Sequence, residues 1–253
     1  MQRRLLIAGN WKMNKGVNEA RLFVQELVKR VGDSLNCEVA VFPPFTSIPA
    51  VADVLRESHI TYGAQNMHWE EKGAFTGEVS PVFLKELGCT YCIIGHSERR
   101  HFFGEGDEAC NLKVRAAIAY GLRPILCCGE TLQERQGGET ISVIRRQLEK
   151  GLKGIAQPEF EIAYEPVWAI GTGQNATPEQ AQEVHSYIRR WLEDNLPLGA
   201  KDVRIIYGGS VKPENVRDLL QEPEIDGVLV GGASLDLDDF VAIVNACTGQ
   251  KGK

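Results

Sequence analysis

Eight short apolar segments recur along the chain at intervals of roughly 30 residues, the spacing of strand–helix units. Most of them are apolar almost without interruption, which is typical of parallel strands that are buried on both faces. The third segment is the weakest strand candidate, because Thr61 and Tyr62 dilute its apolar character. The eight segments are Leu5–Ala8, Val39–Phe42, Ile60–Gly63, Cys92–Ile94, Pro124–Cys127, Ile162–Tyr164, Val203–Tyr207 and Val228–Val230.

Amphipathic helical patterns lie between these segments. Thr177 to Gln180 reads Thr-Pro-Glu-Gln, a capping box with proline at the first helical position, so we expect a helix to begin there. Its buried face contains Ala181, Val184, Ile188, Trp191 and Leu192. An earlier apolar stripe steps by three and four residues through Ala20, Phe23, Val24, Leu27, Val28 and Val31.

Eight strand–helix repeats without a linker or a composition shift close most naturally into a (β/α)8 barrel. We therefore expect an α/β fold with eight parallel strands ringed by helices, in one domain over residues 1–253. A doubly wound open sheet is the alternative. It usually has fewer strands and a glycine-rich first turn, and Gly9-Asn10-Trp11-Lys12 is not such a turn.

Charge and hydropathy exclude several classes of protein. The net charge of −6 argues against a nucleic-acid-binding surface or an acidic-membrane surface. No apolar run approaches the roughly 20 residues that a membrane span requires. The apolar run at the start of the chain is too short for the core of a signal peptide. Small anions remain candidate ligands, because backbone dipoles can bind them against the global charge.

The seven cysteines are odd in number and scattered. Cys89 and Cys92 form a C-x-x-C pair, but no second ligand pair accompanies it, so we expect neither a zinc site nor a redox site. This cysteine usage predicts a reducing, cytoplasmic location.

Polar or glycine residues follow five of the predicted strands. In a parallel barrel these positions meet at one mouth, where the chemistry of such folds is found. Two glycine pairs at adjacent strand ends allow backbone N–H groups to approach a phosphate without an intervening Cβ. The residues are Asn10 and Lys12 after the first strand, His96 after the fourth, Glu165 after the sixth, Gly208-Gly209-Ser210 after the seventh and Gly231-Gly232 after the eighth.

The segment from Ala163 to Gly173 combines a carboxylate with a stiff entry and a flexible tip. An apolar strand ends at Glu165, Pro166 follows at once, and a Gly-Thr-Gly turn closes the segment. This order suits a catalytic base beneath a closing loop. The segment alone is equally consistent with a solvated glutamate on an ordinary βα loop.

Five motifs in chain order resemble those of the triosephosphate isomerase family. The resemblance extends from the first strand to the last helix and implies a TIM barrel and a cofactor-free, metal-free isomerase of glycolysis and gluconeogenesis. The implied reaction interconverts dihydroxyacetone phosphate and D-glyceraldehyde 3-phosphate through an enediolate. The motifs are Ile7-Ala-Gly-Asn-Trp-Lys-Met13, Ile94-Gly-His-Ser-Glu-Arg-Arg100, Ala163-Tyr-Glu-Pro-Val-Trp-Ala-Ile-Gly-Thr-Gly173, Tyr207-Gly-Gly-Ser-Val211 and Val230-Gly-Gly-Ala-Ser234.

The resemblance also implies a role for each matching residue. Glu165 is the expected base, since a carboxylate is a stronger base where a closing loop excludes water. His96, at a helix start, is the expected neutral donor to the developing oxyanion. Lys12 and Asn10 complete the expected catalytic set. The residues themselves leave two readings of Glu98, a partner of Lys12 or His96 and a cap at the helix start. The expected substrate-binding residues are Asn10, Trp11, Lys12, Gly171, Ser210, Gly231 and Gly232.

Residues Pro166 to about Ala176 resemble the mobile loop of the family, with Tyr207 and Ser210 implied as its latch. Many relatives have lysine after Gly-Thr-Gly, whereas this chain has Gln174-Asn175. Glu130, after the fifth strand, is expected to be structural. In the family the loop that matches residues 65–81 inserts into a second subunit, and the residue that matches Thr76 reaches the partner's site. We therefore expect a homodimer.

Two other functions are weighed against the isomerase. A Schiff-base aldolase needs a lysine on a mid-barrel strand, and the predicted strands contain none. A catalytically silent phosphate-binding protein would keep the glycine pairs and could lose the base or the donor. This chain has both Glu165 and His96.

Overall fold

Eight parallel strands form a closed barrel in chain order, and the last strand pairs with the first. The computed structural model describes residues 3–32, 36–169, 176–196 and 199–247. The strands are β1 Leu6–Asn10, β2 Glu38–Phe42, β3 Thr61–Ala64, β4 Tyr91–Ile94, β5 Arg123–Cys128, β6 Glu161–Tyr164, β7 Ile205–Tyr207 and β8 Gly227–Val230. Each overlaps a predicted segment, so the barrel is confirmed and the open sheet is excluded.

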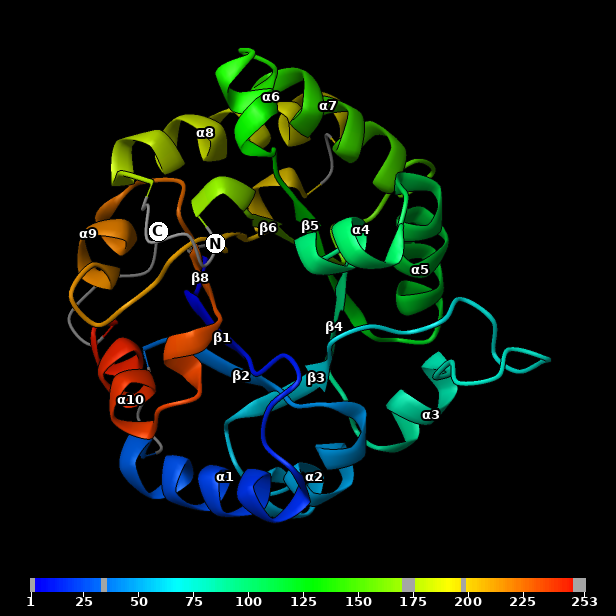
Figure 1. Ribbon diagram of the computed structural model, residues 1–253, viewed down its shortest axis with the longest axis vertical. Coiled ribbons are helices and arrows are strands. Elements are labelled where there is room, and N and C mark those ends of the chain that lie inside the picture. The colour runs from blue at the N-terminus through cyan, green and yellow to red at the C-terminus, as the bar shows by residue number, and fades with distance from the viewer. Residues whose placement is uncertain (1–2, 33–35, 170–175, 197–198, 248–253) are drawn as a thin grey trace.

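Helices surround this barrel as a ring (Figure 1). Within the described residues they are α1 Val17–Val31, α2 Ile48–Leu55, α3 Pro81–Glu86, α4 Ser97–Phe103, α5 Asp107–Ala119, α6 Leu132–Gln136, α7 Thr140–Gly151, α8 Pro178–Asn195, α9 Val216–Gln221 and α10 Leu237–Asn245. The described part of the chain also contains the short 3-10 segments Phe45–Ser47, Val167–Ala169, Ala200–Asp202 and Gly232–Ser234. None of the described helices is long and apolar enough to cross a membrane.

The predicted helix signals are confirmed. The side chain of Thr177 accepts a hydrogen bond from the Gln180 N–H, and Gln180 returns one to the Thr177 N–H, so α8 begins with the expected capping box. In α1, Ala20, Phe23, Val24 and Leu27 are buried as the stripe predicts.

Alternate strand residues supply two separate apolar layers. Residues such as Ile7, Val39 and Ile162 share a cluster with helix side chains, so they face outward to the helices. The second cluster consists of strand residues alone and fills the barrel interior. Its members are Leu6, Ala8, Ala40, Phe42, Tyr91, Ile93, Ile125, Cys127, Ala163, Ile206 and Leu229.

An ion network closes the amino-terminal end of the barrel. The Arg204 guanidinium donates to Glu38 at 2.7 Å, to Glu161 at 2.6 Å and to the Tyr91 hydroxyl at 2.7 Å. Tyr91 in turn donates to Glu38 at 2.6 Å. Burial by itself would raise the pKa of Glu38, but Arg204 and the Tyr91 hydrogen bond lower it below its ordinary value. Glu38 and Glu161 can therefore begin β2 and β6, because Arg204 compensates both of their charges.

Candidate active site

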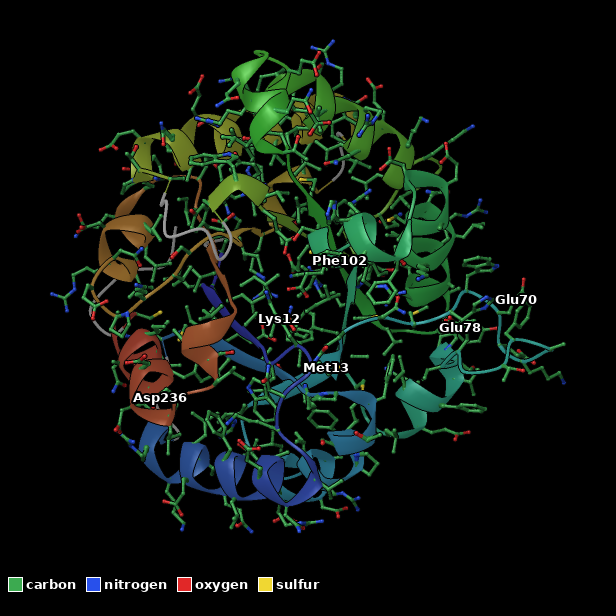
Figure 2. The ribbon with its side chains drawn as sticks, in the orientation of Figure 1. Lys12, Met13, Glu70, Glu78, Phe102 and Asp236 are labelled. Atoms are coloured by element: carbon green, nitrogen blue, oxygen red, sulfur yellow. The ribbon has the colours of Figure 1, made fainter. Side chains whose placement is uncertain are left out.

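A cavity of about 690 Å³ opens where the carboxyl ends of β1, β4, β6, β7 and β8 meet. Figure 2 shows Lys12 near the middle of the ring of helices. The sequence-predicted residues that line this cavity are Asn10, Lys12, His96, Glu165, Gly208, Gly209, Ser210, Gly231 and Gly232. The fold thus brings together residues from five distant motifs.

Lys12 is held in an unusual backbone conformation just past the end of β1. Its φ of 52° lies in the left-handed region, which costs a non-glycine residue about 1–3 kcal/mol. The Asn10 side-chain oxygen accepts from the Lys12 N–H at 3.0 Å, and Gln65 donates to the Lys12 carbonyl at 2.8 Å. The ammonium group pairs with Glu98 Oε1 at 2.7 Å. The hydrogen bonds from Asn10 and Gln65 therefore offset the strain in the Lys12 backbone and hold its ammonium group at the cavity.

His96 is the N-cap residue of α4. Gly95 before it has a φ of 70°, and a Cβ there would lie 2.7 Å from the Cys110 Sγ, so the approach to His96 requires glycine. The Glu98 N–H donates to His96 Nδ1 at 3.2 Å. Because Nδ1 accepts this bond, the neutral ring carries its proton on Nε2.

Glu165 follows β6 and is only 2% exposed. Its Oε2 accepts from the backbone N–H of Ser97 at 2.8 Å. Its Oε1 lies 3.1 Å from His96 Nε2 yet makes no hydrogen bond within the described residues. A buried carboxylate with one unbonded oxygen is poised to accept a proton.

Two glycines leave room for Glu165. A Cβ on Gly208 would lie 2.8 Å from the Glu165 Cγ, and a Cβ on Gly129 would lie 1.7 Å from the Glu165 carbonyl oxygen. The Glu165 N–H also donates to the Cys128 carbonyl at 2.7 Å. The base is therefore positioned by close packing from β5 and from the loop after β7.

The ends of β7 and β8 form the glycine-lined wall of the cavity. A Cβ added to Gly232 would meet no atom within 4 Å, whereas one on Gly231 would lie 3.4 Å from the Lys12 Cε. Ser210 is fixed by its carbonyl, which accepts from Asn215 at 3.0 Å. An anion can therefore approach peptide groups beside a lysine ammonium.

Several predicted residues lie away from the cavity. Trp11 is fully buried and packs edge-on against Phe23, with ring centroids 5.2 Å apart. Tyr207 is buried beside the His185 ring. Thr76 is exposed in the loop between β3 and α3, which projects from the ring of helices (Figure 1). Gly171 and the pair Gln174-Asn175 lie outside the described residues.

Glu130 is fully buried and joins three elements. Its carboxylate accepts from the Tyr164 hydroxyl, from Trp168 Nε1 at 2.9 Å and from Arg135 at 3.0 Å. The Val167 N–H donates to its carbonyl at 3.1 Å. Glu130 thus anchors the segment that directly follows Glu165, in keeping with the structural role expected of it.

Sequence reasoning missed the Ser97 N–H that holds Glu165 and the Gln65 side chain that holds Lys12. Ser97 directly follows His96 at a helix start, so the free N–H groups of that helix end were a usable signal. Gln65 had none, because the contact joins loops that are distant in sequence. Within the described residues, no group of three or more His, Cys, Asp or Glu side chains is arranged to hold a metal ion.

Comparison with known proteins agrees with this geometry. The family model described as triosephosphate isomerase matches residues 5–247. A triosephosphate isomerase from Carboxydothermus hydrogenoformans is 54% identical over 96% of this chain and 98% of the relative. One from Caldanaerobacter subterraneus is 52% identical over 96% and 99%. The crystal structure of the enzyme from Bartonella henselae superposes with a TM-score of 0.89 at 38% identity, covering 96% of this chain and 98% of that one. The chain belongs to the triosephosphate isomerase family.

Proposed function

We propose that this chain interconverts dihydroxyacetone phosphate and D-glyceraldehyde 3-phosphate, with Glu165 carrying the proton. The reaction moves a proton between neighbouring carbons through an enediolate, so it needs a base, an oxyanion donor and a grip on phosphate. The observation that carries the proposal is that the buried Glu165 Oε1 lies 3.1 Å from His96 Nε2, with both residues lining one cavity.

In the proposed first step, Glu165 removes a proton from the carbon next to the carbonyl. The carboxylate is buried and one oxygen is free to accept. The Ser97 N–H holds the other oxygen and leaves the reactive one facing His96. Returning the proton to the adjacent carbon completes the isomerisation.

His96 is the proposed donor to the oxygen that gains negative charge. A neutral imidazole donates from Nε2 without carrying away a full charge, and its orientation is set by the Glu98 N–H on Nδ1. Asn10 supports the same region, since its side chain lies at the cavity and fixes the Lys12 backbone.

Lys12 is the proposed counter-charge for the phosphate and the enediolate. Its ammonium pairs with the partly exposed Glu98, a partner that a dianion can displace. Gly231, Gly232 and Ser210 lie on the same side and would contribute backbone or hydroxyl donors to the phosphate. Trp11 would contact the substrate through its backbone, because its side chain is fully buried against Phe23 and does not reach the cavity.

The segment after Glu165 is the proposed closing loop. It leaves β6 through Pro166 and the 3-10 segment Val167–Ala169, where Trp168 is tied to Glu130. Closure would exclude water while the enediolate exists. On closure, the Gly171 N–H would donate a hydrogen bond to the phosphate. Tyr207 and Ser210 would hold the loop closed.

We further propose one domain over the whole chain, a homodimer built through loop 65–81, and a cytoplasmic location. Large apolar side chains are exposed near the mouth: Met13 is 95% exposed and Phe102 is 71% exposed. Figure 2 shows both on the same side as Lys12, with Glu70 and Glu78 on the projecting loop. Such exposure is a liability unless a partner covers it. All seven cysteines are free thiols, which supports a reducing compartment.

A coupled assay with glyceraldehyde 3-phosphate tests the activity directly. We expect isomerisation with no metal or nucleotide added to that step, and retention of the rate after dialysis against a chelator. Absence of turnover by the purified, folded chain would contradict the proposal.

A further inference from the structure

Gln147 on α7 makes a two-way contact with a peptide group beside Glu165. Its Oε1 accepts from the Gly129 N–H at 2.8 Å, and its Nε2 donates to the Gly129 carbonyl at 3.1 Å. The Gln147 side chain is only 4% exposed, so both hydrogen bonds are shielded from water. Gln147 belongs to the outer ring of helices (Figure 1) and takes no part in the proposed chemical steps.

The side-chain amide of Gln147 takes the place of a neighbouring strand. Cys128, the last residue of β5, accepts from the Glu165 N–H at 2.7 Å through its carbonyl. The pairing of β4 with β5 stops at Leu126, and Gly129 lies beyond that point. The Gln147 amide supplies the one donor and the one acceptor that a strand would offer to the Gly129 peptide.

The helix that carries Gln147 is fixed against the barrel. Val143 and Gly151, one turn before and one turn after Gln147, are buried on the same face of α7. A Cβ on Gly151 would lie 2.9 Å from the Leu126 Cδ2, so α7 packs closely on β5. Gln147 therefore holds Gly129 from a rigid support.

Gly129 transmits this restraint to Glu165. The two backbones lie so close that a Cβ on Gly129 would fall 1.7 Å from the Glu165 carbonyl oxygen. Gln147, Gly129, Ser97 and Glu165 also line a second cavity, of about 320 Å³. Without the Gln147 amide, two buried backbone groups of Gly129 would lose their partners, and the peptide could move into this space.

We propose that Gln147 is a positioning residue for Glu165 and acts through the Gly129 peptide. The inference rests on the proposed function of Glu165 as the base and assigns Gln147 no contact with substrate. Among the described residues, Gln147 is not one of those that line the active-site cavity. A displacement of roughly 1 Å at a reacting group can cost about 10²-fold in rate, so the restraint serves turnover more than binding.

Gln147→Met tests this role, because methionine keeps the length of the side chain and removes the amide donor and acceptor. The kcat for isomerisation of glyceraldehyde 3-phosphate should fall between about 10-fold and about 10²-fold. KM should stay within about twofold, and so should Kd for glycerol 3-phosphate, which carries the phosphate but no carbonyl. In the Glu165→Gln background, Gln147→Met should lower kcat no further.

Asn111→Leu is the matched control. The Asn111 amide donates to the backbone carbonyls of Gly151 and Lys153 at 3.0 and 2.9 Å, at the far end of α7. Its replacement also removes two hydrogen bonds between a side-chain amide and the backbone. Both variants should lower Tm by about 2–8 °C, but Asn111→Leu should keep the parent kcat.

Gln147→Glu provides a pH-dependent rescue. A protonated glutamate can accept from the Gly129 N–H and donate to the Gly129 carbonyl, as the amide does, whereas a carboxylate has no proton to donate. The kcat of this variant, divided by that of the parent at the same pH, should therefore rise as pH falls. A ratio that does not change with pH would show that the donor from residue 147 has no effect on turnover.

Hydrogen exchange gives a readout that does not depend on activity. Gln147→Met should speed exchange of the Glu165 N–H by about 10-fold or more, and Asn111→Leu should leave it as in the parent. Unchanged kcat in Gln147→Met, an equal loss of kcat in Asn111→Leu, or a parallel loss of glycerol 3-phosphate affinity would overturn the proposal. A parent without turnover would contradict the proposed function alone, and exchange at Glu165 would still decide whether Gln147 holds the end of β6.

Discussion

Glu165 Oε1 and His96 Nε2 lie 3.1 Å apart beside the cavity at the carboxyl ends of the strands. Each group reaches this position from a different strand end, Glu165 after β6 and His96 after β4. In the proposed mechanism, a substrate bound beside both groups meets a proton acceptor in Glu165 and a proton donor in His96.

Glu165→Gln should lower kcat by about 10³-fold or more, because the amide keeps the shape and the Ser97 hydrogen bond but cannot accept the proton. Affinity for a phosphate-bearing inhibitor should stay within a few-fold of the parent. Steady-state kinetics and inhibitor titration measure both, with the exposed Glu183→Gln as control. Retention of most turnover would assign the base to another residue.

Lys12→Met should lower kcat/KM by about 10²-fold, since it removes a charge-assisted contact to a dianion. Both KM and kcat should suffer, because the cation is proposed to stabilise bound substrate and enediolate alike. The comparison is with Lys29→Met on the exposed face of α1, which should behave as the parent. An unchanged kcat/KM would remove Lys12 from the site.

Gly129→Ala should lower activity by at least about 10²-fold without touching a chemical group of the reaction. The new Cβ would fall 1.7 Å from the Glu165 carbonyl oxygen, so the end of β6 must move, and displacements near 1 Å are costly in catalysis. Gly137→Ala is the matched control, because its φ is −75° and its nearest neighbour would be 3.4 Å away. Equal activity of both variants would contradict the packing argument.

Thr76→Arg should shift the protein from dimer to monomer and lower kcat with it, because a bulky charge would enter the proposed interface. Sedimentation velocity and activity, followed together over a dilution series, provide the measurement. Leu22→Arg, on an exposed position of α1, should leave both unchanged. A monomer with full turnover would refute the role of loop 65–81.

Glu38→Gln should destabilise the fold by about 3 kcal/mol at pH 7, because the largely buried Arg204 would lose a partly buried ionic partner. The folded pKa of Glu38 lies below its ordinary 4.5, so the stabilisation is full above that pH and is lost as pH falls through the folded value. Urea unfolding of both proteins at several pH values should show the difference shrink below pH 4.5. The exposed Glu57→Gln serves as control, and a gap that stays constant with pH would exclude the carboxylate charge as its cause.

Much of the fold was predictable because each strand and several helices have a local sequence signal, such as a short apolar segment or a capping box. Buried parallel strands must be apolar, so all eight predicted strands lie within two residues of the observed ends. The misplaced boundaries have a physical cause. The predicted strands began at Val39 and Ile162, after Glu38 and Glu161, because an isolated carboxylate does not belong in a sheet; Arg204 compensates both charges across the barrel.

The candidate site was predictable only where a side chain follows its own strand. Asn10, Lys12, His96 and Glu165 do so, and the barrel brings them to one cavity. The burial of the Trp11 side chain and the left-handed backbone of Lys12 depend on contacts with Phe23 and Gln65, which no local pattern encodes.

The pairing of β1 with β8 has a consequence for synthesis on the ribosome. Leu6, Ile7 and Ala8 of β1 lie opposite Gly227, Val228 and Leu229 of β8. One edge of β1 therefore stays unpaired until β8 has been synthesised. Until then the growing chain presents one open strand edge at each side of an incomplete sheet. The barrel therefore cannot close until translation is almost complete. A chain truncated before β8 would keep unpaired strand edges and would tend to aggregate instead of folding into a smaller enzyme.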